Sequence, residues 1–299
     1  MKPTDKIWLD GKMVDWDKAK IHILTHSLHY GTGVYEGIRC YKMSKGSAVF
    51  RLDGHINRLF YSANCIGMKV PFSKKEITDA VKKVLKANKV DECYIRPLIF
   101  YGHGMALNPT NVPVHVGIAV WPWEYPINNA KALSVSISNR RKLNSNAVPV
   151  SAKISGFYSN SVIALLEARK AGFDDTILLD SSGYIAEGPG YNIFIVKNSK
   201  LYTPSLGAIL PGLTRGSVIK IAKDLRMHVY EKKISVKELK TADEAFFTGT
   251  AVEVCPISKI NRRKIGNGKP GPVSLKIKAE YDGIIRGRNS KYKKWLTVV

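Results

Sequence analysis

Any fold of this chain has to accommodate one nearly uncharged stretch, residues 143–167. Its sequence, LNSNAVPVSAKISGFYSNSVIALLE, contains a single charged residue before the final glutamate, Lys153, although the whole chain carries 47 lysines and arginines. Small and apolar neighbours disfavour the charged form of a lysine because they remove its hydration. The neutral amine is the form that forms Schiff bases. For an isolated lysine, however, a loop position with the head group in water is the simpler interpretation.

The composition is that of a globular protein. With 299 residues, 44% hydrophobic and 24% charged, the chain can form one large domain or two ordinary ones around a sizeable core. No apolar run reaches the roughly 20 residues of a membrane helix, and the polar start MKPTDKIWLD predicts no signal peptide. The four widely spaced cysteines argue against a disulfide framework or a zinc site and favour a reducing cytoplasm.

The net charge of +23 raises nucleic acid as a possible partner. The basic residues are nevertheless spread along the chain, with short runs only at residues 262–264 and 291–294. No arginine-rich aromatic motif or reading helix accompanies them. A solvated basic surface is therefore the preferred interpretation, and we expect no nucleic-acid partner, no membrane association and no metal.

The first 122 residues alternate strand and helix patterns. Asp10-Gly11 between two apolar runs predicts a hairpin, and Ser73 followed by Glu76 is a capping box at the start of a helix. Asp53 is expected to cap a helix over residues 54–67. Further strands are expected at residues 34–41, 49–52, 94–101 and 114–120. These patterns predict a small domain, residues 1–122, with a mostly antiparallel sheet.

The second part of the chain is expected to form a larger domain. Residues 123–132 are rich in proline and asparagine and predict an interdomain loop, so the second domain spans residues 133–299. Strands are expected at residues 133–138, 176–179, 184–187, 192–196 and 244–247, and helices at residues 159–171, 215–225 and 274–287. The N-terminal N–H groups of the helix over residues 215–225 and the Thr214 hydroxyl are expected to form an anion site, although Thr214 could also be an ordinary N-cap.

Several separate features could serve one chemistry. Lys153 could form an imine with an aldehyde cofactor, and Glu187, at a strand end, could hold a pyridinium nitrogen. Arg58, Thr214 and Thr250 could bind a phosphate, and Tyr158 could donate to a phenolic oxygen. Each residue also has an ordinary role as a turn residue, a helix cap or a packing group. Spacing alone does not show that they converge.

Seven ordered segments resemble one family. They are HYGTGVYEGIRCY at residue 29, HINRL at 55, CYIRPLIFYG at 93, AKISGFYSN at 152, YIAEGPGYNIF at 184, LPGLTR at 210 and TGTAVEV at 248. Together they resemble the branched-chain amino acid aminotransferases, which are fold-type IV enzymes that use pyridoxal 5′-phosphate. The resemblance implies an α+β protein of two domains, a small α/β N-terminal domain and a larger C-terminal domain with a barrel-like sheet.

The resemblance also implies roles for particular residues. Lys153 would form the Schiff base with the cofactor, Glu187 would pair with the pyridine nitrogen, and Tyr158 would bond to the ring's 3-oxygen. The phosphate would be bound by Arg58, Leu213, Thr214 and Thr250. The substrate carboxylate would meet Thr250, Ala251 and Tyr94, the distal carboxylate of glutamate would meet Arg96, and the side-chain pocket would be walled by Tyr30, Tyr35, Trp123 and Tyr125.

The implied reaction moves the amino group of leucine, isoleucine or valine to 2-oxoglutarate by a ping-pong mechanism, in a homodimer or homohexamer. Alternatives within the fold type are a D-amino acid aminotransferase, an R-selective amine transaminase and an aminodeoxychorismate lyase. The segments YEGIR, YIRP and GTAVE favour the branched-chain enzyme. A basic nucleic-acid-binding protein built on a retired enzyme scaffold is the alternative from another class, but every expected cofactor position is intact.

Overall fold

The protein divides into two compact units in the computed structural model, which describes residues 2–123 and 132–299. Unit 1 comprises Met1–Glu124, Ala152–Phe157 and Ile284–Val299, and unit 2 comprises Tyr125–Ser151 and Tyr158–Gly283. Two segments therefore lie in a different unit from the expected one, because 152–157 and 284–299 join the N-terminal residues. Most of the expected interdomain loop, 123–132, lies outside the described residues, as does Tyr125.

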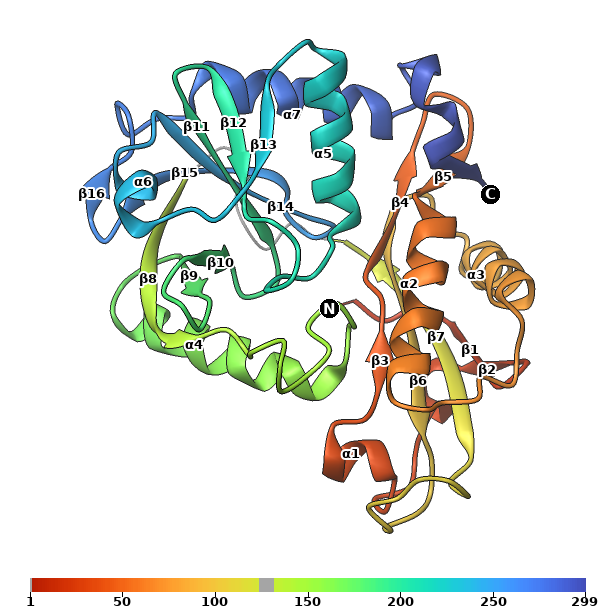
Figure 1. Ribbon diagram of the computed structural model, residues 1–299. Helices are drawn as coiled ribbons and strands as arrows, with labels where there is room; N and C mark the ends of the chain where they lie inside the picture. Colours follow the sequence, from red (N-terminus) through yellow and green to blue (C-terminus); the bar gives the residue numbers. More distant parts are fainter. Residues whose placement is uncertain (1, 124–131) are drawn as a thin grey trace. The chain divides into compact units, whose positions relative to one another are not determined.

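Unit 1 is built on an eight-stranded antiparallel sheet (Figure 1). Its main order is β17-β5-β4-β6-β7-β1-β2, and β3 pairs with β6. The strands are β1 (Lys6–Leu9), β2 (Lys12–Asp15), β3 (Val34–Tyr35), β4 (Ile38–Lys42), β5 (Ser47–Phe50), β6 (Cys93–Tyr101), β7 (Val114–Pro122) and β17 (Leu296–Val298). Asp10 and Gly11 have φ values of 46° and 88°, so the expected two-residue hairpin is confirmed.

Three α-helices belong to unit 1: α1 (His26–Tyr30), α2 (Leu52–Cys65) and α3 (Lys74–Asn88). The capping box of α3 is confirmed, because Ser73 and Glu76 bond reciprocally. The predicted start of α2 was wrong. Arg51, with a left-handed φ of 53°, is the N-cap, and Asp53 lies inside the first turn without capping it. The backbone N–H of Arg51 instead donates to the Trp295 carbonyl, which fixes the sharp turn from β5 into the helix.

The single strand expected at residues 34–41 is two short strands, β3 and β4, with Glu36 and Gly37 between them. A Cβ atom at Gly37 would lie 1.8 Å from the Tyr94 hydroxyl oxygen, so only glycine fits there. The Glu36 side chain is fully buried. The break therefore makes room for the Tyr94 hydroxyl at Gly37 and buries the Glu36 carboxylate.

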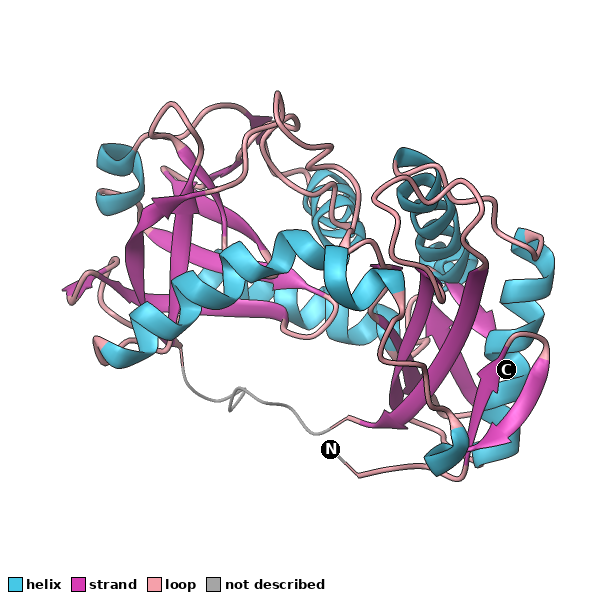
Figure 2. Ribbon diagram, turned by 90° about the horizontal axis from the view of Figure 1, so that it is seen from below, coloured by secondary structure: helices cyan, strands magenta, loops and turns pink. Residues whose placement is uncertain are grey.

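Unit 2 is built on a nine-stranded mixed sheet of order β10-β9-β8-β15-β14-β11-β12-β13, with β16 paired to β15. The strands are β8 (Leu133–Arg141), β9 (Asp175–Leu179), β10 (Ile185–Glu187), β11 (Asn192–Lys197), β12 (Lys200–Thr203), β13 (Val229–Glu231), β14 (Glu244–Gly249), β15 (Glu253–Ile260) and β16 (Arg263–Lys264). β8 runs parallel to both β9 and β15. In Figure 2 the strands of each unit form a sheet with helices packed against it.

The helices of unit 2 are α4 (Tyr158–Lys170), α5 (Leu213–Asp224), α6 (Val236–Lys240) and α7 (Pro272–Ile285). Gly172 ends the α4 region with a φ of 82°, as expected of a C-cap glycine. The predicted start of α5 at residue 215 was wrong: the helix begins at Leu213, Gly212 is the N-cap, and Thr214 lies in the first turn and is not an N-cap. No helix in the described ranges is long and apolar enough to cross a membrane.

Candidate active site

Lys153 lies on a segment of unit 1 that runs beside residues 31–35. Its carbonyl accepts a hydrogen bond from the Tyr35 N–H at 3.2 Å, and the Ser155 N–H donates to the Gly33 carbonyl at 2.7 Å. The Lys153 N–H donates to the Ser62 hydroxyl on α2 at 2.9 Å. The flanking residues Ala152 and Ile154 are buried in the core. The backbone around the expected Schiff-base lysine is therefore held by hydrogen bonds to residues 33–35 and to α2.

Two glycines allow this segment to approach so closely. The Gly156 N–H donates to the Gly31 carbonyl at 2.9 Å. A Cβ atom at Gly31 would lie 2.7 Å from the Cα atom of Gly156, and Gly31 also has a left-handed φ of 65°. Any larger residue at Gly31 would push residues 152–157 away. The close approach of the two backbones thus explains the glycines at positions 31 and 156.

A buried ion network on α2 surrounds Arg58. The Arg58 guanidinium donates from Nε and Nη2 to the two Glu36 carboxylate oxygens at 2.6 and 2.8 Å. His55 Nδ1 lies 2.8 Å from the same carboxylate. The Ser62 hydroxyl, which receives the Lys153 N–H, donates to the Arg58 carbonyl at 2.8 Å. One helix therefore fixes both Arg58 and the backbone of Lys153.

The charges of this network follow from burial and ion pairing. Burial by itself raises the pKa of Glu36, but the Arg58 guanidinium and the His55 contact outweigh it and hold the pKa well below its ordinary range. Burial lowers the pKa of His55, which the Glu36 carboxylate only partly offsets. Glu36 is thus an ion and His55 a neutral imidazole at neutral pH.

Arg96 lies among aromatic rings in unit 1. Its guanidinium carbon is 4.6 Å from the Tyr35 ring centroid, 5.4 Å from that of Tyr94 and 5.9 Å from that of Trp121. Tyr94 and Arg96 are two residues apart on β6, so their side chains share a face of the sheet. Arg96 Nε is buried and has no hydrogen-bond acceptor among the described residues. The arrangement combines an apolar wall with one cation that can bind an anion.

The other aromatic residues expected in the pocket differ in where they lie in unit 1. The Trp123 ring lies 4.6 Å from the Tyr94 ring, so it joins the same group. Tyr30 is 41% exposed, and its hydroxyl donates to the Met105 carbonyl. The Lys153 ammonium nitrogen is 4.7 Å from the Tyr35 ring centroid. Unit 1 thus places Lys153 and Arg96 beside the same ring, that of Tyr35.

Glu187 is held rigidly inside unit 2. Its Oε2 accepts hydrogen bonds from Asn192 Nδ2 at 3.0 Å and from the Leu210 N–H at 3.2 Å. Its Oε1 forms an ion pair with Lys142 Nζ at 2.5 Å. Asn192 Nδ2 also donates to the Leu210 carbonyl at 2.9 Å, which ties the strand β11 to the loop before α5. The carboxylate therefore has a fixed orientation.

The first turn of α5, where an anion site was expected, has no side-chain cap. Gly212 provides no side-chain cap, so the N–H groups of Leu213 and Thr214 point out of the helix end without a capping oxygen. A Cβ atom at Gly212 would lie 2.0 Å from Asn192 Oδ1, which requires glycine at this position. The side chain of Thr214 is buried. The same asparagine thus positions Glu187 and the start of α5.

The other expected residues of unit 2 lie at element ends. Tyr158 is the first residue of α4, and Thr250 and Ala251 form the turn between β14 and β15. On β14, the Thr248 hydroxyl is buried without a hydrogen-bond partner among the described residues. A turn of small residues beside an unsatisfied hydroxyl is suited to close approach by a ligand.

Several of these positioning residues are not evident from the sequence. Glu36, His55, Ser62, Lys142 and Asn192 were not expected to have roles, although each contacts or orients an expected site residue. Lys142 had one usable signal, since it is the last charged residue before the nearly uncharged stretch. Asn192 had a signal as well, since it follows Glu187 by five residues in the segment YIAEGPGYNIF. Glu36 and His55 contact each other across 19 residues and Ser62 contacts Lys153 across 91, so no local pattern marks these three.

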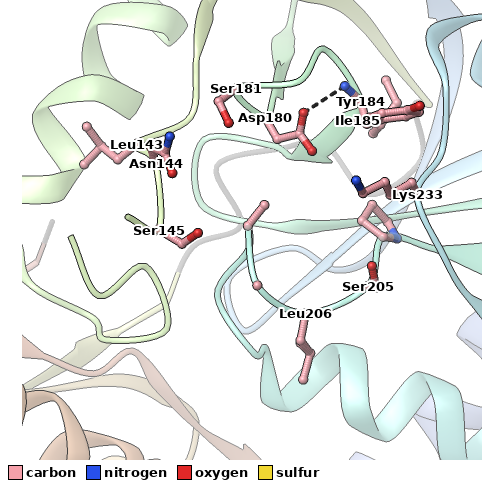
Figure 3. Close-up of a pocket in the computed structure, with 13 residues that line it drawn as sticks. Leu143, Asn144, Ser145, Asp180, Ser181, Tyr184, Ile185, Ser205, Leu206 and Lys233 are labelled. Atoms are coloured by element: carbon pink, nitrogen blue, oxygen red, sulfur yellow. Dashed lines mark hydrogen bonds between the residues drawn. The ribbon is translucent and has the colours of Figure 1, made fainter. Parts of the chain in front are cut away.

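A cavity of about 230 Å³ in unit 2 contains none of the expected site residues (Figure 3). Its rim includes Leu143, Ser145, Asp180, Tyr184 and Lys233. One Asp180 oxygen accepts from the backbone N–H groups of Ser182 and Tyr184, both at 2.9 Å, as in an ordinary turn. This cavity is therefore a feature of a surface turn and not the candidate site.

Comparison with known proteins identifies the family. The family model described as amino-transferase class IV matches residues 33–260. The chain belongs to this family. A class IV aminotransferase fold agrees with the two sheets and with the order of the motifs, so the fold-type IV architecture and the family resemblance inferred from the sequence are confirmed.

This class IV aminotransferase is similar over its full length to curated branched-chain-amino-acid aminotransferases. The protein from Pseudomonas aeruginosa is 43% identical over 297 residues, which cover 98% of this chain and 97% of that one. The Escherichia coli K12 protein is 40% identical and covers 100% and 98%. Crystal structures of the T.th. branched-chain amino acid aminotransferase, complexed with N-(5′-phosphopyridoxyl)-L-glutamate or with 4-methylvaleric acid, match with a TM-score of 0.95 and 41% identity, covering 99% and 98%.

Proposed function

We propose that this enzyme is a branched-chain-amino-acid transaminase (EC 2.6.1.42) that uses pyridoxal 5′-phosphate. It moves the amino group of leucine, isoleucine or valine to 2-oxoglutarate and yields branched-chain 2-oxo acids and L-glutamate. The observation that carries the substrate assignment is Arg96 among the rings of Tyr35, Tyr94 and Trp121. The rings provide an apolar wall for branched side chains, and the guanidinium binds the distal carboxylate of glutamate. The relatives support the same assignment.

The residues present fit the cofactor. Lys153 supplies an amine, Glu187 an oriented carboxylate for the pyridine nitrogen, and Tyr158 a hydroxyl for the 3-oxygen. The α5 helix start lacks a side-chain cap, which suits a phosphate. The phosphate ligands would be the N–H groups of Leu213 and Thr214, the Thr250 turn and Arg58. When bound, pyridoxal phosphate supplies an aldehyde and a ring that accepts electrons.

The chain's own residues direct the proton transfers. Lys153 Nζ removes the proton from the substrate Cα atom and acts as the general acid and base of the reaction. The ring of Tyr35 beneath this nitrogen limits its positions. By resemblance to the family, Tyr94, Thr250 and Ala251 would bind the substrate carboxylate, and Tyr30 and Tyr125 would contribute to the side-chain pocket. Because the amino group is held by the enzyme between two substrates, the kinetics are ping-pong.

An amino-donor panel tests this proposal. The purified, cofactor-loaded enzyme is assayed with L-leucine, L-isoleucine, L-valine and D-alanine, with 2-oxoglutarate as the acceptor. We expect the L-amino acids to be turned over fastest and Lys153→Ala to abolish turnover together with the visible absorbance of the bound cofactor. Faster turnover of D-alanine would instead assign a D-amino acid aminotransferase, and release of a product without amino transfer would assign a lyase.

The oligomeric state and the location belong to the same proposal. We infer a homodimer or homohexamer in the cytoplasm that binds neither nucleic acid nor membranes. Exposed apolar side chains near α1 and the β6–β7 connection, including Ile23, Leu28 and Leu107, support self-association. Sedimentation equilibrium of the purified protein tests the assignment, and a monomer at micromolar concentration would contradict it.

A further inference from the structure

Lys142 is the cation next to Glu187. Its side chain is only 16% exposed, and its Nζ lies 2.5 Å from Glu187 Oε1. The residue directly follows β8, and its backbone N–H donates to the Leu179 carbonyl on β9 at 2.8 Å. Because β9 pairs with β10, which carries Glu187, the backbones of both residues are fixed in one sheet. The ion pair is therefore built into the fold of unit 2.

The two oxygens of Glu187 have different partners. Two neutral N–H donors, from Asn192 and Leu210, occupy Oε2, whereas Lys142 contacts Oε1. An oxygen of a carboxylate has two lone pairs, so Oε1 can accept from Lys142 and from one further donor. That further donor is the pyridine nitrogen in the proposed function. Lys142 and the cofactor ring would then share one oxygen.

We propose that Lys142 is a positioning residue that neutralises the charge of Glu187. It thereby sets how strongly cofactor binding at this carboxylate depends on a protonated ring nitrogen. The inference rests on the proposed function. A buried carboxylate without a cation is strongly destabilised. With Lys142 present, Glu187 stays paired whether or not the ring nitrogen is protonated. Without Lys142, none of the described partners of Glu187 is a cation, so its charge becomes strongly coupled to that of the pyridinium.

A comparison of two cofactors measures this coupling. One is pyridoxal phosphate, and the other is its 1-deaza analogue, in which a C–H group replaces the ring nitrogen. Dissociation constants are measured by titrating cofactor-free protein and following the absorbance of the bound form. We expect Lys142→Met to increase the preference for pyridoxal phosphate over the deaza analogue by about tenfold relative to the wild type, since contacting charges couple by this order.

Two further variants serve as controls. Lys142→Arg retains the positive charge and is expected to keep the wild-type preference within about twofold. Lys278→Met removes another partly buried lysine of unit 2, one that pairs with Asp282 on α7, and is expected to leave the preference unchanged. An unchanged preference in Lys142→Met would overturn the inference. If the wild type bound neither cofactor, the proposed function itself would fail.

Stability provides a second readout that needs no cofactor. Lys142→Met leaves Glu187 with neutral donors only, so the melting temperature of the cofactor-free protein is expected to fall. Lys142→Met combined with Glu187→Gln removes both charges and is expected to melt above the single variant. The comparison remains possible if Lys142→Met folds poorly, because the double variant should then recover folding. A double variant no more stable than Lys142→Met would contradict the proposed neutralisation.

Discussion

In the proposed function, the single side chain of Arg96 serves two different substrates. Its guanidinium packs against the aromatic rings of Tyr35 and Tyr94, which in the proposed function provide the apolar surface for the substrate side chain. A guanidinium is weakly hydrated and planar, which makes such packing favourable. The N–H groups at its edge remain suited to a carboxylate. On this proposal, leucine and glutamate bind at the same place in turn.

Arg96→Gln should separate the two substrates. Charge-assisted hydrogen bonds contribute about 1.5–3 kcal/mol, so kcat/KM for L-glutamate should fall about 10- to 100-fold. kcat/KM for L-leucine should change by less than about threefold, because leucine has no distal carboxylate. Steady-state kinetics with both donors provide the measurement, with the exposed Arg140 changed to Gln as a control. Equal losses for both substrates would show that Arg96 acts through packing alone.

At the scale of elements, the buried Glu36 carboxylate fastens α2 to the break between β3 and β4. The pKa of Glu36 is lowered from its ordinary value of 4.5. Its ionised form therefore stabilises the folded protein above pH 4.5, and this stabilisation is lost as the pH falls below that value. The pKa of His55 is also lowered from its ordinary value of 6.5. As the pH falls below 6.5, His55 is therefore protonated in the unfolded chain before it is protonated in the folded protein. Both groups therefore make the protein less stable as the solution becomes more acidic.

Glu36→Gln tests this network. The substitution leaves the buried Arg58 without its carboxylate and should lower the free energy of unfolding at pH 7 by about 3 kcal/mol. The variant should also lose less stability than the wild type between pH 5 and pH 4, because the titrating carboxylate is gone. Thermal or urea unfolding across this pH range provides the measurement. Asp79→Asn, on the exposed face of α3, should leave the unfolding midpoint unchanged.

The crossing of Gly31 and Gly156 can be tested against a matched glycine. Gly46 has a φ of 69°, close to the 65° of Gly31, but a Cβ atom there would meet nothing within 4 Å. Gly46→Ala therefore measures backbone strain alone, about 1 kcal/mol. Gly31→Ala should destabilise the protein further and weaken cofactor binding, because it displaces the Lys153 segment. The free energy of unfolding and the cofactor dissociation constant are measured for both variants. Equal changes in Gly31→Ala and Gly46→Ala would show that the crossing tolerates a methyl group.

The sequence allowed the elements to be predicted better than the connections between them. The capping box at Ser73 and the hairpin at Asp10 are local patterns, and both were confirmed. The starts of α2 and α5 were predicted wrongly, because contacts with Trp295 and Asn192, distant in the chain, determine where these helices begin. The roles of Lys153 and Glu187 came from resemblance to a family. Their supporting residues, such as Ser62 and Lys142, became visible only when the chain was folded.

At the scale of the whole molecule, unit 1 is completed by the C-terminus. β17 pairs with β5 through the last residues, from Leu296 to Val298. The Trp295 ring packs edge-on against Phe50, and its carbonyl accepts the N–H of Arg51 at the start of α2. Arg286 forms a two-bond ion pair with Glu92 beside β6. The tail is therefore part of the first sheet and its core.

Removal of residues 290–299 should destabilise unit 1 selectively. β5 would lose its outer partner, so backbone amides of β4 and β5 should exchange hydrogen at least about tenfold faster. Amides of β14 and β15 in unit 2 should keep their protection. Hydrogen exchange followed by mass spectrometry provides the measurement, and Trp295→Ala should give a smaller change in the same strands. Uniform loss of protection across both units would contradict this expectation.

The discontinuous course of unit 1 also affects the order in which the protein is completed during synthesis. The ribosome releases the N-terminal residues first. Unit 2 has all of its residues once Gly283 has been added, whereas unit 1 waits for the last residues up to Val299. The unit that is begun first is therefore finished last. Until then β5 is an open strand edge, which makes the nascent chain depend on the prompt arrival of β17.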